Sequence, residues 1–276
     1  MKLFTMLSGL AVSAAFCSLS LGQITGTVKL DGKAPEMKPI DMSGVAECAA
    51  KHEKPVNDQT VVANDKGGLQ FVVVSLKPAE GQDLGEGAKK KAATLDQEGC
   101  QYHPHVLAMQ AGATLNIKNS DEFLHNVHSL AEKNPAFNFA QANKGSKPVR
   151  DIKDPEVFHV KCDVHPWMSA YIAVFEHPYF AVTDKDGNFS IDTKGLKDGD
   201  YDITAWQEKY DKQEGKVTVK DGKGKVDFTY KAEAASADPI RHEVKLTDLV
   251  KVREAEGKSC CDGRETKGTG AQAKAD

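Results

Sequence analysis

Hydrophobic positions along most of the chain alternate with polar ones or form short apolar runs, which is the pattern of β-strands. Ile24–Leu30 alternates and ends at the turn-forming pair Asp31-Gly32, and Leu69–Leu76 is a run rich in β-branched residues. Further strands are predicted at Val106–Met109, Thr114–Lys118, Val157–Lys161 and Ala170–Phe175. Short strands separated by turns predict an all-β fold of the sandwich type.

From Phe180 onward the predicted strands follow one another closely. Ala181–Thr183, Phe189–Ile191 and Tyr201–Trp206 are separated by Asp186-Gly187 and Asp198-Gly199, and such Asp-Gly pairs predict tight hairpins. The run from Thr183 through Gly187, Phe189, Gly199 and Tyr201 to Ala205 resembles the carboxypeptidase regulatory-like family. The resemblance implies a small transthyretin/Ig-like β-sandwich in this part of the chain.

The same family pattern normally begins with two strands that here lie far upstream. Gly26-Thr27-Val28 and Phe71–Val74 fit those strands, and both precede the central segment 80–178. The second sandwich is therefore predicted either to be discontinuous, built from 23–79 and 179–231 around 80–178, or to follow it in tandem. Residues 232–276 lose the hydrophobic periodicity and are predicted to be a disordered tail.

The beginning of the chain predicts export. Lys2 is followed by an apolar run, Leu3–Phe16, and then by small residues, so 1–22 is typical of a secretory signal peptide. We therefore expect a periplasmic or secreted protein. A net charge of -4 without a basic stripe argues against a nucleic-acid partner, and no other apolar stretch is long enough to predict a membrane span.

Five of the six cysteines remain once the predicted signal, with Cys17, is removed: Cys48, Cys100, Cys162, Cys260 and Cys261. In an oxidising compartment cysteines tend to form disulfides or bind metals. We predict a disulfide between Cys48 and Cys100. The alternative for Cys48 is a metal site shared with His52. The adjacent pair Cys260-Cys261 carries no prediction.

Cys162, His165 and Met168 are spaced three residues apart, so a single turn can direct a thiolate, an imidazole and a thioether at one point. A histidine from the upstream segment His125–His128 would complete a set of two nitrogen atoms, one thiolate and a weak sulfur ligand. That set is diagnostic of blue copper electron-transfer sites. Zinc is a poorer fit because methionine is not among its usual ligands.

The Cys-x-x-His-x-x-Met loop and the upstream His125-Asn126-Val127-His128 resemble the cupredoxin family of blue (type 1) copper proteins, with amicyanin and plastocyanin as its nearest types. The resemblance covers roughly 100–175. It implies a Greek-key β-sandwich and one copper ion held by His125, Cys162, His165 and Met168. It also implies that Asn126 ties the loops together with hydrogen bonds and that the edge of His165 is an exposed electron port.

The expected function is therefore the transfer of single electrons between a protein donor and a protein acceptor, without catalysis. A copper storage or delivery module and a structural or adhesive surface protein are the alternatives. His128 stays an alternative to His125 as ligand. His103 and His105 would share one face of a strand, either as ordinary histidines or as a second metal site, and Trp167 would either border the port or pack on the second domain.

Overall fold

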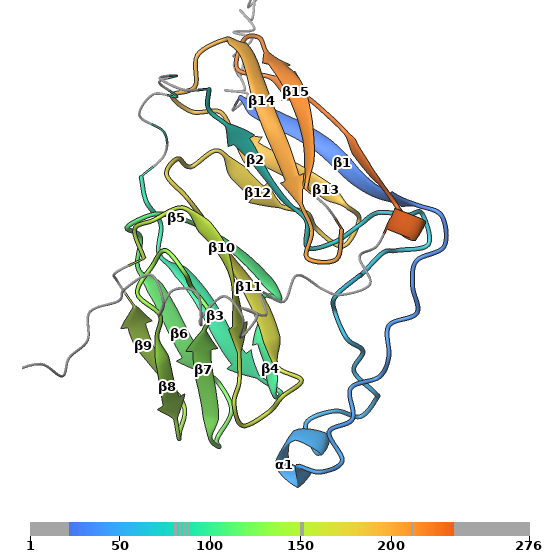
Figure 1. Ribbon diagram of the computed structural model, residues 1–276, viewed down its shortest axis with the longest axis vertical. Coiled ribbons are helices and arrows are strands. Elements are labelled where there is room, and N and C mark those ends of the chain that lie inside the picture. Colours follow the sequence, from blue (N-terminus) through green and yellow to red (C-terminus); the bar gives the residue numbers. More distant parts are fainter. Residues whose placement is uncertain are drawn as a thin grey trace, which may run out of the picture. The chain divides into compact units, whose positions relative to one another are not determined.

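The chain is nearly all β, as predicted (Figure 1). The computed structural model describes residues 22–79, 82, 84, 87, 89–149, 152–210 and 212–234. By its contacts the chain divides into two compact units, Met1–Pro239 and Ile240–Asp276, of which the second lies outside the described residues. So do the predicted signal peptide up to Leu21 and Cys260-Cys261. Within the described ranges no helix is long and apolar enough to cross a membrane.

The first sandwich is formed by two sheets, with strand orders β5-β11-β10-β7-β8 and β4-β3-β6-β9. Its strands are β3 (Ala93–Glu98), β4 (Gln101–His103), β5 (Val106–Gln110), β6 (Leu115–Asn119), β7 (His125–Ser129), β8 (Asn138–Gln141), β9 (Gly145–Val149), β10 (Glu156–Lys161) and β11 (Ser169–Phe175). Alternate residues of these strands, among them Leu115, Ile117, Phe158 and Val160, are buried in its core. β8 and β9 use a stretch that had no predicted structure, and each adds an edge strand to its sheet.

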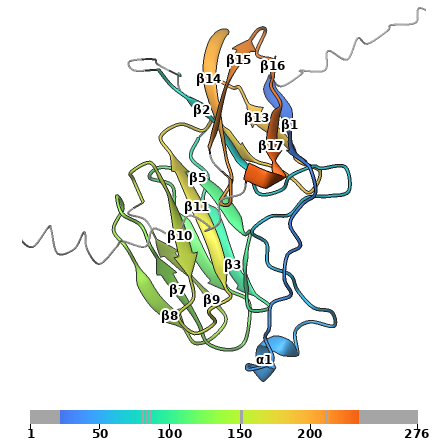
Figure 2. The same ribbon diagram turned by 45° about the vertical axis from the view of Figure 1, so that its right-hand side comes forward.

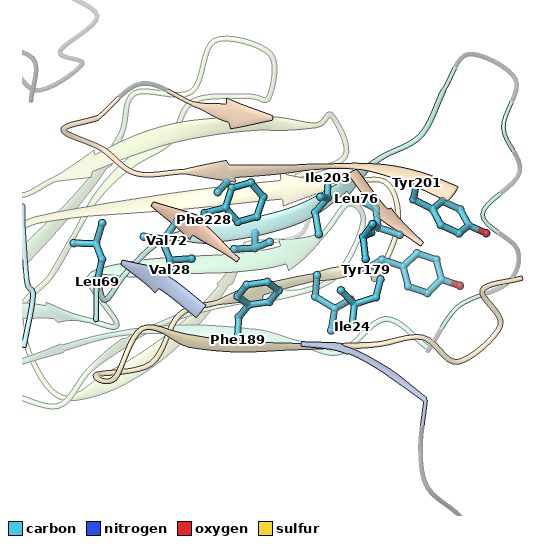
Figure 3. Packing of buried hydrophobic residues seen from close by; sticks show 14 of the residues in the cluster. Ile24, Val28, Leu69, Val72, Leu76, Tyr179, Phe189, Tyr201, Ile203 and Phe228 are labelled. Carbon is cyan, nitrogen blue, oxygen red and sulfur yellow. The ribbon is translucent and has the colours of Figure 1, made fainter. Parts of the chain in front are cut away.

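The second sandwich also has two sheets, β13-β1-β16 with β17 alongside β1, and β12-β2-β14-β15. Its strands are β1 (Gln23–Asp31), β2 (Val73–Lys77), β12 (Phe180–Val182), β13 (Asn188–Asp192), β14 (Gly199–Trp206), β15 (Gln213–Val219), β16 (Gly224–Lys225) and β17 (Phe228–Lys231), and the short 3-10 helix η1 (Ala232–Ala234) follows. Its core gathers the inward residues of both sheets (Figure 3). Gly26 is required in β1, because a Cβ there would lie 1.7 Å from the carbonyl oxygen of Val226.

The prediction of tight hairpins at the two Asp-Gly pairs is wrong. β12 and β13, which flank Asp186-Gly187, belong to different sheets, and so do β13 and β14, which flank Asp198-Gly199. The first pair does form a turn, in which Gly187 has a φ of 77° and the Asp184 carboxylate accepts two backbone N–H groups. That turn connects strands of the two sheets, and β13 pairs with β1 instead of with β12.

A long connection between β1 and β2, which we call the arm (32–66), leaves the second sandwich and carries the short helix α1 (Ala46–Ala49) (Figure 2). Its two limbs meet where Ile40 donates a backbone hydrogen bond of 2.7 Å to Val56. Met42 and Cys48 at its far end are buried in the hydrophobic core of the first sandwich. The arm therefore packs on the first sandwich, although the predicted domain boundaries assign it to the second.

Candidate metal centre

The predicted ligand loop is the connection between two paired strands. β10 ends at Lys161, which pairs with Ser169 at the start of β11, so residues 162–168 form a closed turn. Inside it the Cys162 sulfur accepts the N–H of His165 at 3.3 Å, and the N–H of Met168 donates to the His165 carbonyl at 2.9 Å. Cys162 and Met168 are buried, and among the described residues Cys162 is the one cysteine outside a disulfide.

His125 begins β7, next to this turn. His128 of β7 pairs with Lys161, the last residue of β10. His125, three residues earlier in the antiparallel β7, therefore extends past the end of β10 and lies alongside the 162–168 turn. Its Nδ1 is 3.1 Å from Nδ1 of His165, and that nitrogen is 3.8 Å from Sγ of Cys162. Donor atoms of His125, Cys162 and His165 all lie within 4.8 Å of one another. The structure therefore brings these three predicted ligands together in a buried position.

His128, the alternative ligand, faces another partner. Its Nδ1 is 2.9 Å from the Asp163 carboxylate, which also pairs with Lys161, and its side chain is partly exposed. The difference follows from the strand geometry, since residues three apart on a strand point to opposite faces.

Sequence reasoning missed Asp121, a buried carboxylate that contacts His125. Its Oδ2 accepts a hydrogen bond of 2.9 Å from Nε2 of His125, and its two oxygens also accept the N–H groups of Gly99 and Cys100. Nζ of Lys51, a residue of the arm, lies 3.3 Å from Oδ1 of Asp121. Burial opposes ionisation of Asp121, but these hydrogen bonds hold its pKa below the usual range. Its position four residues before His125 was the signal available in the sequence.

The carboxylate on Nε2 orients the His125 ring so that Nδ1 faces Cys162 and His165. Burial lowers the pKa of His125 and also that of His165, where the neighbouring His125 adds to the effect. Both imidazoles are therefore neutral near pH 7, which is the form that binds metals.

Asn126 and Tyr102 tie together the strands beside these histidines. The Asn126 side chain donates to Asn138 and accepts the N–H of Asp163, so it links β7, β8 and the 162–168 turn. The Tyr102 hydroxyl lies 2.6 Å from the carbonyl oxygen of Asn126 and 3.1 Å from that of Lys161. Burial raises the pKa of Tyr102. These bonds fix the backbone next to His125 and Cys162.

The expected exposed edge of His165 is not present, because the arm covers this end of the sandwich. The exposed fraction of His165 is 3% and that of His125 is 0%. Cys48 of α1 is disulfide-bonded to Cys100, and their sulfur atoms belong to a group within 4.8 Å of a His165 ring nitrogen. Trp167 donates its Nε1–H to the Cys100 carbonyl at 3.1 Å and packs with the first sandwich, so it does not pack on the second. Its ring lies beside that of His165, with the ring centroids 5.4 Å apart.

Four further described histidines do not belong to the donor group. His103 is exposed and His105 is buried, so they do not share a face: Pro104 interrupts the strand between β4 and β5. His105 bonds Glu208 of the second sandwich through Nε2 and the Ser169 carbonyl through Nδ1. His52 bonds the Gly99 carbonyl at 2.7 Å, and His159 the Ser169 hydroxyl at 2.8 Å.

The donor set fits a metal ion of the copper type. Nitrogen and sulfur ligands bind such ions at about 2.0–2.3 Å, and donors at that range around one centre lie about 3–4 Å apart. The spacings of 3.1 Å and 3.8 Å meet this requirement. Two facing Nδ1 atoms, a buried thiol and a methionine in the same turn form a softer set than the carboxylate-rich sites of magnesium or calcium.

No protein-family model and no curated protein sequence matches the chain. Among solved structures it is similar to a copper-containing nitrite reductase (NirK) from Thermus scotoductus SA-01, with 23% identity, 37% of this chain and 27% of that chain covered, and a TM-score of 0.30. A novel purple cupredoxin from Nitrosopumilus maritimus (20% identity, 30% and 99% covered, TM-score 0.26) is also similar. A mutant of amicyanin with Cu(I) is a third (16% identity, 37% and 98% covered, TM-score 0.28). The chain thus spans about a quarter of the reductase chain. None of the three supports the carboxypeptidase regulatory-like resemblance, which stays a prediction.

Proposed function

We propose that this protein binds one copper ion through His125, Cys162, His165 and Met168 and carries single electrons between a protein donor and a protein acceptor. The observation that carries the proposal is the buried group in which two imidazole Nδ1 atoms face each other at 3.1 Å, beside the thiol of Cys162. A copper ion bound there would supply the one-electron couple between Cu(I) and Cu(II).

The chain's own residues keep the donors in place when the charge at the centre changes. The turn 162–168 is closed by paired strands, Asp121 orients His125, and Asn126 joins the turn to β8. Burial excludes water from the donor atoms. A centre whose ligands are held by packing and hydrogen bonds needs little rearrangement between oxidation states. These features favour a carrier over a catalyst.

Two exposed apolar side chains support a protein partner. Leu124 and Val164, with exposed fractions of 42% and 44%, directly precede His125 and His165. Apolar surface of this kind is typical of the centres of protein interfaces. An exported location, periplasmic or secreted, agrees with the disulfide, and the mature N-terminus of the secreted protein would test it.

The experiment is an absorption spectrum of the copper-loaded protein. We expect an intense thiolate-to-copper band near ~600 nm, as in blue copper sites. The band should vanish in Cys162→Ala and persist in His105→Ala, which removes a buried imidazole away from the donor group. A colourless copper complex of the unmodified chain would contradict the proposal.

We also propose that the second sandwich is one discontinuous domain, 23–79 with 179–231, around the copper domain 80–178, although its arm (32–66) packs on the copper domain. The pairing of β1 with β13 and of β2 with β14 supports this division. A chain in which a short Gly-Ser linker replaces 80–178 is expected to unfold cooperatively. Non-cooperative unfolding of that chain would count against the division.

A further inference from the structure

The disulfide between Cys48 and Cys100 lies directly beside the candidate copper ligands. Sulfur atoms of both cysteines and a ring nitrogen of His165 lie within 4.8 Å of one another. The Cys100 sulfur forms a second such group with Asp121 and His125. Cys48, Cys100 and both imidazoles are nearly or completely buried, so these atoms share one water-poor space.

The two cysteines come from different parts of the chain. Cys100 lies in the turn between β3 and β4 of the first sandwich, whereas Cys48 is carried by α1 at the far end of the arm. The arm is also attached through Lys51 to Asp121 and through His52 to Gly99. A disulfide that only attached the arm could have formed at any of these contacts. The observed disulfide instead has sulfur atoms within 4.8 Å of imidazole nitrogens.

Disulfide sulfurs are poor metal ligands, but thiolates are strong and soft ones. Both cysteines are synthesised as thiols, so a dithiol form precedes the disulfide in every molecule. In that form Cys48, Cys100 and Cys162 offer three thiolates beside two imidazoles, and soft sulfur donors select Cu(I).

We infer that Cys48 and Cys100 in their dithiol form, with His165, are a Cu(I)-acquiring site that disulfide closure then removes. Closure joins the two sulfur atoms and gives two electrons and two protons to a disulfide oxidant, which becomes a dithiol. The two extra thiolates are then lost as ligands, and His125, Cys162, His165 and Met168 are left as the donors. The inference extends the proposed function to the way in which the centre is loaded.

The test measures Cu(I) binding without the proposed blue site. All variants carry serine in place of Cys17, Cys260 and Cys261, and alanine in place of Cys162. Each variant that keeps both Cys48 and Cys100 is prepared in the disulfide form and, after dithiothreitol and anaerobic desalting, in the dithiol form, with thiol titration as the check. Cu(I) in competition with bicinchoninate is the probe.

We expect the dithiol form to hold one Cu(I) per chain at least about tenfold more tightly than the disulfide form. Adding His165→Ala should abolish that gain. Cys48→Ser and Cys100→Ser keep a single thiol and form no disulfide, and we expect them to bind Cu(I) no more tightly than the disulfide form. His52→Ala should retain the gain, because the His52 ring is bonded to the Gly99 carbonyl.

Equal Cu(I) affinity of the dithiol and disulfide forms would overturn the inference, and so would a gain that depends on His52 instead of His165. Because both forms are the same polypeptide, a folding defect of one serine variant does not remove the comparison. The proposed function fails separately, by the absence of the Cys162-dependent band in the disulfide form of the unmodified chain.

Discussion

Buried histidines in two regions of the molecule differ in what their ring nitrogens contact. In the candidate centre, Nδ1 of His125 and Nδ1 of His165 face each other and the Cys162 thiol. At the contact between the sandwiches, both nitrogens of His105 are bonded by chain oxygens, those of Glu208 and Ser169. Both nitrogens of His105 thus meet oxygen atoms, whereas in His125 only Nε2 does, and its Nδ1 faces the other donor atoms. The two regions therefore differ in the partners of their histidines, at equal burial.

The surroundings of these histidines also differ between the two regions. The rings of Phe71 and Tyr171 pack edge-on against His105, and Trp206 packs against Tyr171. These aromatic residues belong to a small apolar cluster between the sandwiches. Such packing stabilises the contact of two sheets. The candidate centre instead gathers sulfur and nitrogen donors from a turn, a strand and the arm.

The largest expected effect is on copper affinity. His125→Ala removes a donor atom, so we expect copper affinity to fall by more than the roughly 100-fold that loss of an outer partner causes, and the band near ~600 nm to disappear. His105→Ala should leave both unchanged. Titration of the apo variants with Cu(II), followed by absorption, measures the difference. Equal losses in the two variants would break the comparison.

The second effect is on the free energy of unfolding, where we expect His105→Ala to have the larger effect of the two variants. His105→Ala leaves the buried carboxyl group of Glu208 without its partner, at a cost of about 3–5 kcal/mol in the free energy of unfolding. Adding Glu208→Ala should recover part of that loss, because the orphaned group is then removed as well. Urea unfolding of the single and double variants gives both values. An unaltered stability of His105→Ala would show that the pair contributes nothing.

A half-buried carboxylate at the start of β10 should, like His105, affect stability and not copper binding. Glu156 accepts the N–H groups of Glu132, Lys133 and Asn134 as well as the Asn134 side chain. Burial opposes ionisation, yet these donors hold the pKa of Glu156 below its ordinary value of 4.5. Its stabilisation is therefore complete above pH 4.5 and is lost as the pH falls below that value.

Glu156→Gln is expected to lower the free energy of unfolding by about 1 kcal/mol at pH 7, the low end for charged hydrogen bonds because the carboxylate is partly exposed. The difference from the unmodified chain should shrink at pH 3.5, and copper binding at pH 7 should not change. Urea unfolding at the two pH values measures it. A constant difference would mean that the pKa of Glu156 is the same in the folded and in the unfolded protein.

The parts of this picture that the sequence predicts are local ones. Cys162, His165 and Met168 lie in one turn, so their spacing alone indicates that they converge, and the alternation of residues in β10 or β1 indicates strands. The Asp-Gly pairs indicate a turn but not which sheet the next strand joins. That choice depends on β1, a strand distant in the sequence, which pairs with β13. The contact of Asp121 with His125 is indicated only by their spacing of four residues. The covering of His165 depends on where the arm packs, which no local pattern indicates.

The smallest expected effect concerns the choice between His125 and His128, on which the comparison ultimately rests. His128 is partly exposed and pairs with Asp163, which keeps Lys161 and Asn138 as partners when the imidazole is removed. His128→Ala should therefore change the free energy of unfolding by less than about 1 kcal/mol, as expected for an exposed pair, and leave the copper band intact. The measurement is the same spectrum and unfolding curve as for His125→Ala. Loss of the band would make His128 the ligand, and the facing Nδ1 atoms of His125 and His165 would then lose their meaning as a metal signature.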